Sequence, residues 1–318
     1  MSPVLRGALL SLAAFGLYAT HDVVVKTLGA HYTSFQIIFF SGLLSFPLVS
    51  VLLLSDRTDG NLVPRHPWWS LLRSITGVAT GAMGFFAFSV LPMAQCYAML
   101  FAMPLIITLL SIPMLGEKVG LRRGLAVLVG LAGVLIVLRP GSAPMSIGHL
   151  AGLGAAFTGA LTSVIVRKIG KEERSVVLMM YPMLMSVAAM GLALPFVYRP
   201  MPVEHLALTG VIALLGMAGA ALIIAVYRAA PAVIVAPMQY SQIIWAAFYG
   251  WLLFDERIDS WTAAGAAVII ASGIYIVLRE GTPDVSRNRP VLENRSRLDV
   301  GTIPRIGTWL KRFAPKEG

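Results

Sequence analysis

The sequence predicts an all-α integral membrane protein with ten transmembrane helices and both termini in the cytoplasm. Three observations support this fold. Hydrophobic residues make up 57% of the 318 residues and charged residues only 13%, whereas a soluble domain keeps about a quarter of its residues charged. Ten apolar runs approach the roughly 20 residues that a bilayer crossing needs. Basic residues gather in alternate joints between these runs, which is typical of membrane topology.

The ten apolar runs follow one another through the chain, and most joints between them are short. The runs are residues 7–28, 35–54, 71–90, 93–115, 120–138, 147–166, 175–198, 206–226, 233–254 and 261–278. Joints rich in Gly, Pro or charged residues separate them: SDRTDGNLVPRHP, LPMA, GEKVGLRRG, RPGSAP, RKIGKEERS, YRPMPVEH and DERIDS. Because such residues favour turns over helix, each run is predicted to be a separate spanning helix.

Basic residues are distributed unequally between the two sides of the predicted bundle. Ten spans place both termini on one side, and 21 of the 25 Lys and Arg residues then fall on that side. The four on the other side are Lys26, Arg139, Arg199 and Arg257. Cytoplasmic loops carry the excess of Lys and Arg in membrane proteins, so both termini are predicted to be cytoplasmic.

Motifs of the first half of the chain reappear in the second half, in the same order and at nearly one offset. The matched pairs are VVVKTLG (23–29) with VIVRKIG (164–170), Pro92 with Pro231, Glu117 with Glu256, and VLIVLRPG (134–141) with IYIVLREG (274–281). The offset is 139 to 141 residues throughout. We therefore predict two five-helix units, residues 5–141 and 147–281.

An odd number of spans in each unit places the second unit upside down relative to the first. Inverted repeats of this kind occur in secondary transporters, whose substrate site lies near the bilayer midplane between the halves. Pro104 stands thirteen residues before Glu117, whereas Ile243 stands thirteen residues before Glu256. The two units are therefore expected to differ at this point.

These motifs resemble those of a known superfamily. The two blocks that run from a proline to GE or DE, the ten spans and the repeat are similar to the EamA-type drug/metabolite transporters, over residues 5 to 281. The stretches HDVVVK and APMQYSQIIWAAFYGWLLFDE resemble the branch that contains riboflavin and S-adenosylmethionine importers. The resemblance implies a secondary transporter of a small organic metabolite in the bacterial inner membrane, working by alternating access with proton coupling or exchange.

The first predicted helix carries ionisable residues where lipid or core is expected. In a helix centred near Leu17, His21 and Asp22 lie roughly 6–8 Å from the midplane, where a charge costs roughly 2.5–3.5 kcal/mol. Tyr18, Asp22 and Lys26 share one stripe, with His21 beside it. We predict that Tyr18, His21 and Asp22 line a substrate cavity. His21, Asp22 and Lys26 are the candidates for proton coupling, since imidazole titrates near neutral pH.

A structural role is the alternative for the same residues. Asp22 and Lys26 would then form an i,i+4 ion pair near the outer interface, and His21 would make a structural hydrogen bond. The repeat equivalents of His21 and Asp22 are Thr162 and Ser163. These two are predicted either to contact substrate through their hydroxyls or to bond to helix backbone.

The ninth predicted helix carries a second polar and aromatic cluster. Gln239, Gln242 and Trp245 share one face, and Tyr240 lies beside them. Two amides and an indole suit a planar or heteroaromatic ligand, because small-molecule sites combine apolar walls with a few placed polar groups. The alternative is that Trp245 and Tyr249 are packing or interfacial aromatics.

The fourth predicted helix begins with Gln95 and Tyr97 near its outer end. We expect these two residues to contact substrate at an entrance, or else simply to lie at the interface. Glu117 and Glu256 recur with the repeat at helix ends, on opposite sides of the membrane. They are predicted to be structural groups of the loops.

Several classes of function lack their sequence signals. The single cysteine, Cys96, rules out an intrachain disulfide, and the chain contains no Walker A, HExxH, GxSxG or CxxC motif. We expect no ATP drive, metal, cofactor or enzymatic activity. The expected partners are a small-molecule substrate and the lipid bilayer, without nucleic acid, for a monomer or homodimer. The alternatives are an integral-membrane enzyme, which would need clustered acids, histidines or cysteines at one face, and a non-transporting sensor or assembly protein.

The tail, residues 282–318, is polar and basic and is predicted to be largely disordered. Within it, residues 302–313 place apolar side chains at helical spacing beside basic ones. This segment is predicted either to form an amphipathic helix on the cytoplasmic leaflet or to be disordered like the rest.

Overall fold

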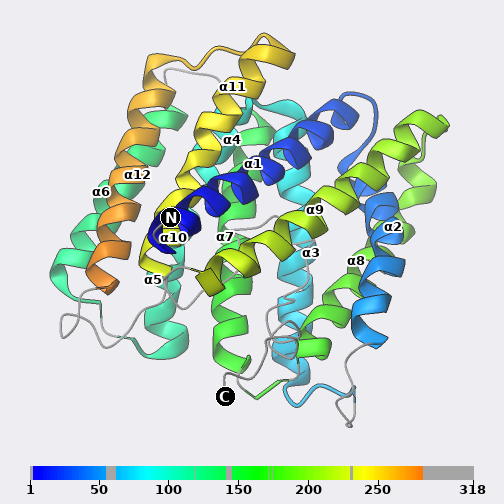
Figure 1. Cartoon of the computed structure of the whole chain (residues 1–318), viewed down its shortest axis with the longest axis horizontal. Coiled ribbons are helices and arrows are strands. Elements are labelled where there is room, and N and C mark those ends of the chain that lie inside the picture. Colours follow the sequence, from blue (N-terminus) through cyan, green and yellow to red (C-terminus); the bar gives the residue numbers. More distant parts are fainter. Residues whose placement is uncertain are drawn as a thin grey trace.

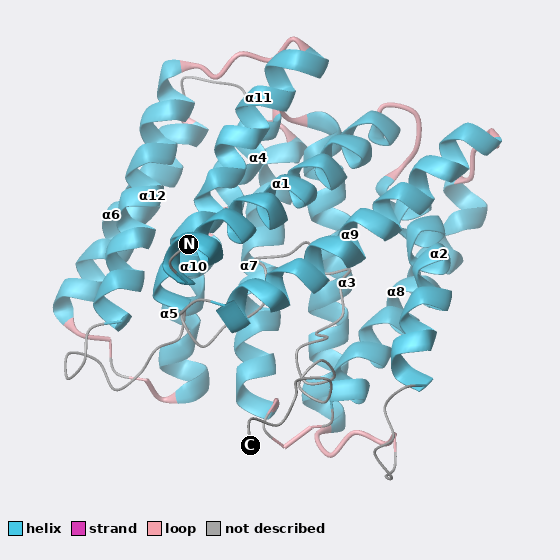
Figure 2. Ribbon diagram, in the orientation of Figure 1, coloured by secondary structure: helices cyan, strands magenta, loops and turns pink. Residues whose placement is uncertain are grey.

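The computed structural model describes residues 3–54, 62–117, 119–140, 145–170, 172–173, 175–229 and 232–281. Helices joined by short loops make up these ranges, and no strand occurs in them (Figure 2). The predicted tail, including residues 302–313, lies outside the described residues.

The described helices follow the predicted apolar runs in order. They are α1 (Pro3–Gly29), α2 (Ser34–Leu54), α3 (Pro67–Val90), α4 (Met93–Leu100), α5 (Met103–Leu115), α6 (Leu121–Leu138), α7 (Ile147–Ile169), α8 (Ser175–Val197), α9 (Val203–Ala229), α10 (Ala232–Met238), the 3₁₀ turn η1 (Gln239–Ser241), α11 (Gln242–Phe254) and α12 (Ser260–Gly281). The predicted run 93–115 therefore contains two helices, and the run 233–254 contains two helices and a 3₁₀ turn.

Eight stretches of the described part are long and apolar enough to cross a membrane. They are Leu9–Gly29, Pro67–Val90, Met93–Leu115, Leu121–Leu138, Ile147–Ile169, Met180–Val197, Val203–Ile223 and Ser260–Arg279. A shorter apolar helix, Ser34–Pro47, belongs to the second run. An all-helical membrane fold with eight candidate spans is thus established.

The main helix contacts join the first half of the chain to the second. α1 packs on α9, α3 on α7, α2 on α8 and α6 on α12. In Figure 1, α6 and α12 lie at one edge, α2 and α8 at the opposite edge, and α1, α3, α7 and α9 between them. The offset of about 140 residues relates α1 to α7 and α3 to α9, so the α1–α9 pair is equivalent to the α7–α3 pair. It also relates α2 to α8 and α6 to α12, so each of these two pairs joins equivalent helices.

Two membrane-length segments are interrupted at equivalent positions. α4 and α5 are separated at Phe101 and Ala102, and α10 and α11 are separated by η1, 139 residues further on. The sequence led us to expect a difference between the halves here, because Pro104 has no counterpart at Ile243. Both segments are interrupted, but the interruptions differ in form: Phe101 and Ala102 make a short turn, and residues 239–241 make a 3₁₀ turn. Pro104 lies at the start of α5, just after the first interruption, whereas Pro237 lies inside α10, just before the second.

Both interrupted segments also end alike. Gly116 and Asp255 take up left-handed backbone conformations, with φ of 68° and 52°. The following amide of Glu117 then donates to Ser111 O (3.3 Å) and that of Glu256 to Gly250 O (2.9 Å). A left-handed residue just after the last turn is a common way to end a helix, and in both segments the next amide also reaches back six residues. It fixes the position of each glutamate relative to its helix.

The loop before α12 is held to the end of α6. Asp259 accepts bonds from the amides of Trp261 and Thr262, both 3.1 Å, and pairs with Arg139 at 2.9 Å. Burial by itself raises the pKa of Asp259. Its bonds to Thr262 and the guanidinium of Arg139 outweigh that effect and hold the pKa below its usual value.

α6 and α12 approach each other closely enough for their backbones to touch. A Cβ placed on Gly265 would lie 2.6 Å from Gly133 O and 3.0 Å from Val137 N, both backbone atoms that cannot rotate away. Small residues at a helix crossing allow this approach in membrane proteins. The contact joins the last helix of each half.

We expect Gly265→Ala to lower the unfolding free energy by about 1–3 kcal/mol, because the added methyl overpacks this contact. Thermal unfolding of the detergent-solubilised protein measures the effect. Gly124→Ala is the matched control, since no atom lies within 4 Å of a Cβ there and alanine favours helix by up to about 1 kcal/mol. Equal stability of the two variants would contradict the close contact.

Candidate functional site

Four polar side chains from three helices meet inside the bundle. Asp22 and His21 come from α1, Tyr97 from α4 and Gln242 from the start of α11. The Tyr97 hydroxyl donates to Asp22 Oδ2, His21 Nδ1 lies 2.7 Å from Asp22 Oδ1, and Gln242 Nε2 donates to the Tyr97 oxygen at 3.4 Å. All four are 1–3% exposed. We call these residues the Asp22 cluster.

Local chain features place each member of the Asp22 cluster. Pro92 precedes α4, so Tyr97 falls in the second turn of a short helix that ends at Leu100. Gln242 is the first residue of α11, and the 3₁₀ turn before it fixes its position. Its backbone N–H donates to Gln239 O and Tyr240 O. The two helix breaks therefore bring α4 and α11 to the same level as Asp22.

Aromatic rings surround the Asp22 cluster. The His21 imidazole meets Phe85 edge-on at 5.9 Å between centroids, and Tyr97 meets Phe88 at 5.3 Å. Phe101, at the first helix break, packs against Tyr240 at 4.9 Å. Aromatic rings thus pack against both the imidazole and the phenol that contact the Asp22 carboxyl group.

The Asp22 cluster has the chemistry of a proton-holding site. A buried carboxylate is costly unless it is hydrogen-bonded, and Asp22 has an O–H donor on one oxygen and an imidazole nitrogen on the other. His21 donates if Asp22 is ionised and can accept if Asp22 carries the proton. A carboxyl–imidazole pair of this kind can bind and release a proton without leaving either group unpaired.

A second part of the site lies beside the first. The Trp245 and Tyr249 rings stack at 6.2 Å with 25° between their planes, and the Tyr249 hydroxyl lies 3.0 Å from the Thr20 hydroxyl. A Cβ on Gly16 would lie 3.3 Å from the indole ring of Trp245, so α1 offers that ring a flat surface. Trp245 and Gln242 stand one turn apart on α11, which connects this aromatic pair to the Asp22 cluster.

The structure brings together only part of the predicted set. Tyr18 packs against Gly219 of α9, where a Cβ would lie 2.8 Å from its ring. Gln239 and Tyr240 are buried in the 3₁₀ turn, and the Tyr240 hydroxyl lies over Gly273. Gln95 is half-buried. Whether these side chains contact substrate stays a prediction.

The repeat equivalents of His21 and Asp22 lie on a different helix pair. Thr162 donates to the Thr76 hydroxyl at 2.7 Å, between α7 and α3, and Ser163 is half-buried. One turn before Thr162, Thr158 receives a bond from Thr80 at 2.8 Å. The hydroxyls of this half thus bond across a helix interface, and any contact with substrate remains a prediction.

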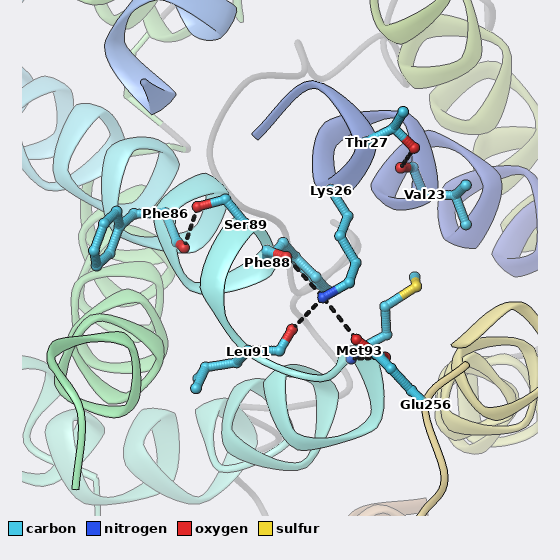
Figure 3. A network of polar contacts seen from close by, with 9 residues as sticks. All are labelled: Val23, Lys26, Thr27, Phe86, Phe88, Ser89, Leu91, Met93 and Glu256. Atoms are coloured by element: carbon cyan, nitrogen blue, oxygen red, sulfur yellow. Dashed lines mark hydrogen bonds and ion pairs between the residues drawn. The ribbon is translucent and has the colours of Figure 1, made fainter. Parts of the chain in front are cut away.

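Lys26 has a partner that the sequence analysis did not propose. Its ammonium lies 2.8 Å from Glu256 Oε1 and donates to Leu91 O at 2.6 Å (Figure 3). Glu117, at the equivalent position of the first half, pairs with Arg167. The prediction that these glutamates are structural groups of the loops did not include their partners. Each glutamate forms an ion pair with a basic residue of the opposite half of the chain.

The described residues contain no group of three His, Cys, Asp or Glu side chains placed to hold a metal ion. A cavity of about 470 Å³ lies between α6 and α12 and is lined by Leu135, Ile136, Arg139 and Trp261. None of these residues belongs to the Asp22 cluster.

Comparison with known proteins identifies one family and several named relatives. The EamA-like transporter family matches this chain twice, over residues 5–139 and 146–279. A pseudopaline exporter of Pseudomonas aeruginosa is 25% identical over 276 residues, which are 85% of this chain and 95% of the relative. An S-adenosylmethionine uptake transporter of Rickettsia bellii is 24% identical over 266 residues, 82% of this chain and 90% of the relative.

Two further matches extend this comparison. A riboflavin transporter of Vibrio cholerae is 30% identical over 212 residues, 65% of this chain and 70% of the relative. One solved crystal structure, 18% identical, covers 86% of this chain and 98% of its own chain with a TM-score of 0.52. This last likeness is one of fold.

We expect Asp22→Asn and Tyr97→Phe to be non-additive in their effects on stability, because each removes the partner of the other. A double-mutant cycle by thermal unfolding in detergent should give a coupling of about 1–2 kcal/mol. Tyr32→Phe is the control. Tyr32 lies ten residues after Asp22 in the chain, and its hydroxyl bonds to His205 instead. Its effect should add to that of Asp22→Asn within about 0.5 kcal/mol. Additivity in both pairs would rule out the Asp22–Tyr97 bond.

Proposed function

We propose, because this chain belongs to the EamA-like transporter family, that it moves a small organic metabolite across the membrane by alternating access. Membership makes it a multi-pass membrane transporter of small molecules, in keeping with its apolar helices. The proposal adds the mechanism, the location of the site and the kind of substrate.

The observation that carries the proposal is the Asp22 cluster. Ionisable and polar groups at this depth in a membrane protein face a pathway or one another, and here they come from both halves of the chain. α1 and α4 precede residue 141, and α11 follows residue 147. A site between two halves near the membrane midplane is where secondary transporters of repeated architecture bind their substrates.

The substrate that suits this site has a planar part and polar groups. The stacked rings of Trp245 and Tyr249 provide flat apolar surface, and Gln242 provides an amide with donor and acceptor atoms. The relatives are named for pseudopaline, S-adenosylmethionine and riboflavin, and their names include both an exporter and an uptake transporter. Family membership therefore determines neither the substrate nor the direction of transport. The chemistry of the site favours substrates that have a planar part and polar groups.

We propose that Asp22 and His21 couple transport to protons. The pair can take up one proton and release it again while both groups stay hydrogen-bonded, as described above. Exchange of one metabolite for another is the alternative coupling, and it would require no titration of the pair.

The topology completes the proposal. Ten crossings with both termini in the cytoplasm account for the one-sided distribution of basic residues. The units 5–141 and 147–281 would then be two inverted repeats, with α4–α5 and α10–α11 each forming one interrupted crossing. A membrane enzyme is the less favoured function, since the named relatives are transporters.

Uptake and counterflow in proteoliposomes test the proposal, with a panel of vitamins, nucleosides, amino acids and drugs, in the presence and absence of a pH gradient. We expect Asp22→Asn and His21→Ala to reduce transport to background while the proteins remain folded and inserted. Asp259→Asn is the matched control, because this carboxylate lies in a loop beside Arg139 and should leave transport unchanged. Full transport by both Asp22→Asn and His21→Ala would remove the site.

Trp245→Ala should raise the apparent KM for a planar substrate about tenfold, because loss of a stacked ring removes about 1–3 kcal/mol of binding. The maximal rate should change much less. Trp251→Ala, on the exposed side of the same helix, is the control and should leave the KM unchanged. An unchanged KM in Trp245→Ala would assign this indole to packing.

A further inference from the structure

An ion-pair network closes one end of the bundle between the two halves of the chain. Lys26, near the end of α1, pairs with Glu256 after α11 at 2.8 Å. The second carboxylate oxygen of Glu256 accepts the backbone N–H of Met93 at 2.9 Å. Figure 3 shows the ammonium of Lys26 between Glu256 and the carbonyl groups of Phe88 and Leu91. One network thus ties α1, the α3–α4 joint and the end of α11.

An equivalent ion pair closes the opposite end. Arg167, near the end of α7, pairs with Glu117 after α5. Met93 and Leu115 are the two ends of one 23-residue stretch that is long enough to cross a membrane, and one ion pair lies at each of these ends. Each pair again joins one half of the chain to the other.

The repeat relates the two pairs to each other residue by residue. Lys26 matches Arg167 at an offset of 141, and Glu117 matches Glu256 at an offset of 139. The basic residue of each half pairs with the acidic residue of the other half. Both glutamates follow a left-handed residue and a six-residue backbone bond, as described for α5 and α11. The same local structure therefore builds one closure at each end.

Ion pairs with little exposure are poor sources of net stability, because desolvation offsets most of their attraction. Their attested use is to select one arrangement of the chain over others. With both pairs formed, the Asp22 cluster between them is 1–3% exposed. The two pairs thus stand where a substrate would enter and leave.

We infer that Lys26, Glu256, Arg167 and Glu117 are gating residues, and that the two ion pairs break in alternation to open the site to one side at a time. This inference rests on the proposed alternating access and assigns its two gates. The gate at Lys26 has the additional bonds to Met93 and Leu91.

The single cysteine of the chain reports on the first gate. Cys96 is 1% exposed and lies one turn along α4 from Met93. Its repeat equivalent is Val235, 0% exposed and one turn along α10 from Ala232. Val235→Cys in a Cys96→Ala background reports on the second gate. Both proteins are placed in lipid nanodiscs, where a water-soluble maleimide reaches both ends.

The expected result is a crossed pattern of labelling rates. Lys26→Gln should raise the labelling rate of Cys96 about tenfold, because the population of a minor open state would grow from about 1% to about 10%. It should leave the labelling rate of Val235→Cys unchanged. Arg167→Gln should do the reverse. Lys26→Arg and Arg167→Lys keep the charge and should label like the parent proteins. This rescue would not follow from a loss of general stability.

Lys168→Gln is the matched control at the second gate. Lys168 donates to Met114 O at 3.0 Å and lies over the Trp69 ring, beside the Arg167 pair. Its loss should change neither rate. Equal acceleration of both reporters by either gate variant, or acceleration of neither, would overturn the gates. The labelling experiment needs no substrate. If no compound of the panel were transported but the labelling rates still showed the crossed pattern, the result would count against the proposed function and not against the gates.

Discussion

A carboxyl group placed among apolar helices must find its hydrogen-bond partners within the protein, and this constraint shapes the centre of the structure. Asp22 takes one partner from its own helix and one from α4, and Tyr97 in turn reaches α11. Three helices from both halves are thereby held at one level. Because an unsatisfied buried polar group costs about 1–3 kcal/mol, the position of each helix matters to the other two.

The repeat produces similar backbones with different chemistry. Both halves interrupt the same crossing, and the glutamate after it is placed in the same way. The side chains then diverge: one half carries His21 and Asp22 on α1, and the other carries Thr162 and Ser163 on α7. A duplicated frame can therefore keep two matched conformations while only one half holds an ionisable group.

Much of the fold follows from hydrophobic runs and repeat offsets, because membrane helices satisfy their own backbone bonds and are read from composition. Asp22 was predicted from the cost of a charge in an apolar segment, Tyr97 from its place near a helix end, and Gln242 from a polar and aromatic helix face. Nothing in the sequence shows that the three meet. The aromatic wall of Phe85, Phe88 and Phe101 was missed, since phenylalanine in a spanning helix is ordinary. The break at Gln239–Ser241 was missed, because the proline at the start of α5 has no counterpart at Ile243. The ion pairs of Glu117 and Glu256 depend on contacts between halves, which no local pattern contains.

The two helix breaks have a consequence for how such a site is mapped. At Phe101–Ala102 and at Gln239–Ser241 the regular backbone ladder is interrupted, beside Tyr97 and Gln242. Main-chain carbonyl and amide groups at such interruptions are available to ligands in other transporters with broken helices. An alanine scan leaves every one of those groups in place. The scan would therefore measure only the contribution of side chains to the binding free energy. Backbone-directed changes such as amide-to-ester replacement would measure the contribution of the main-chain groups.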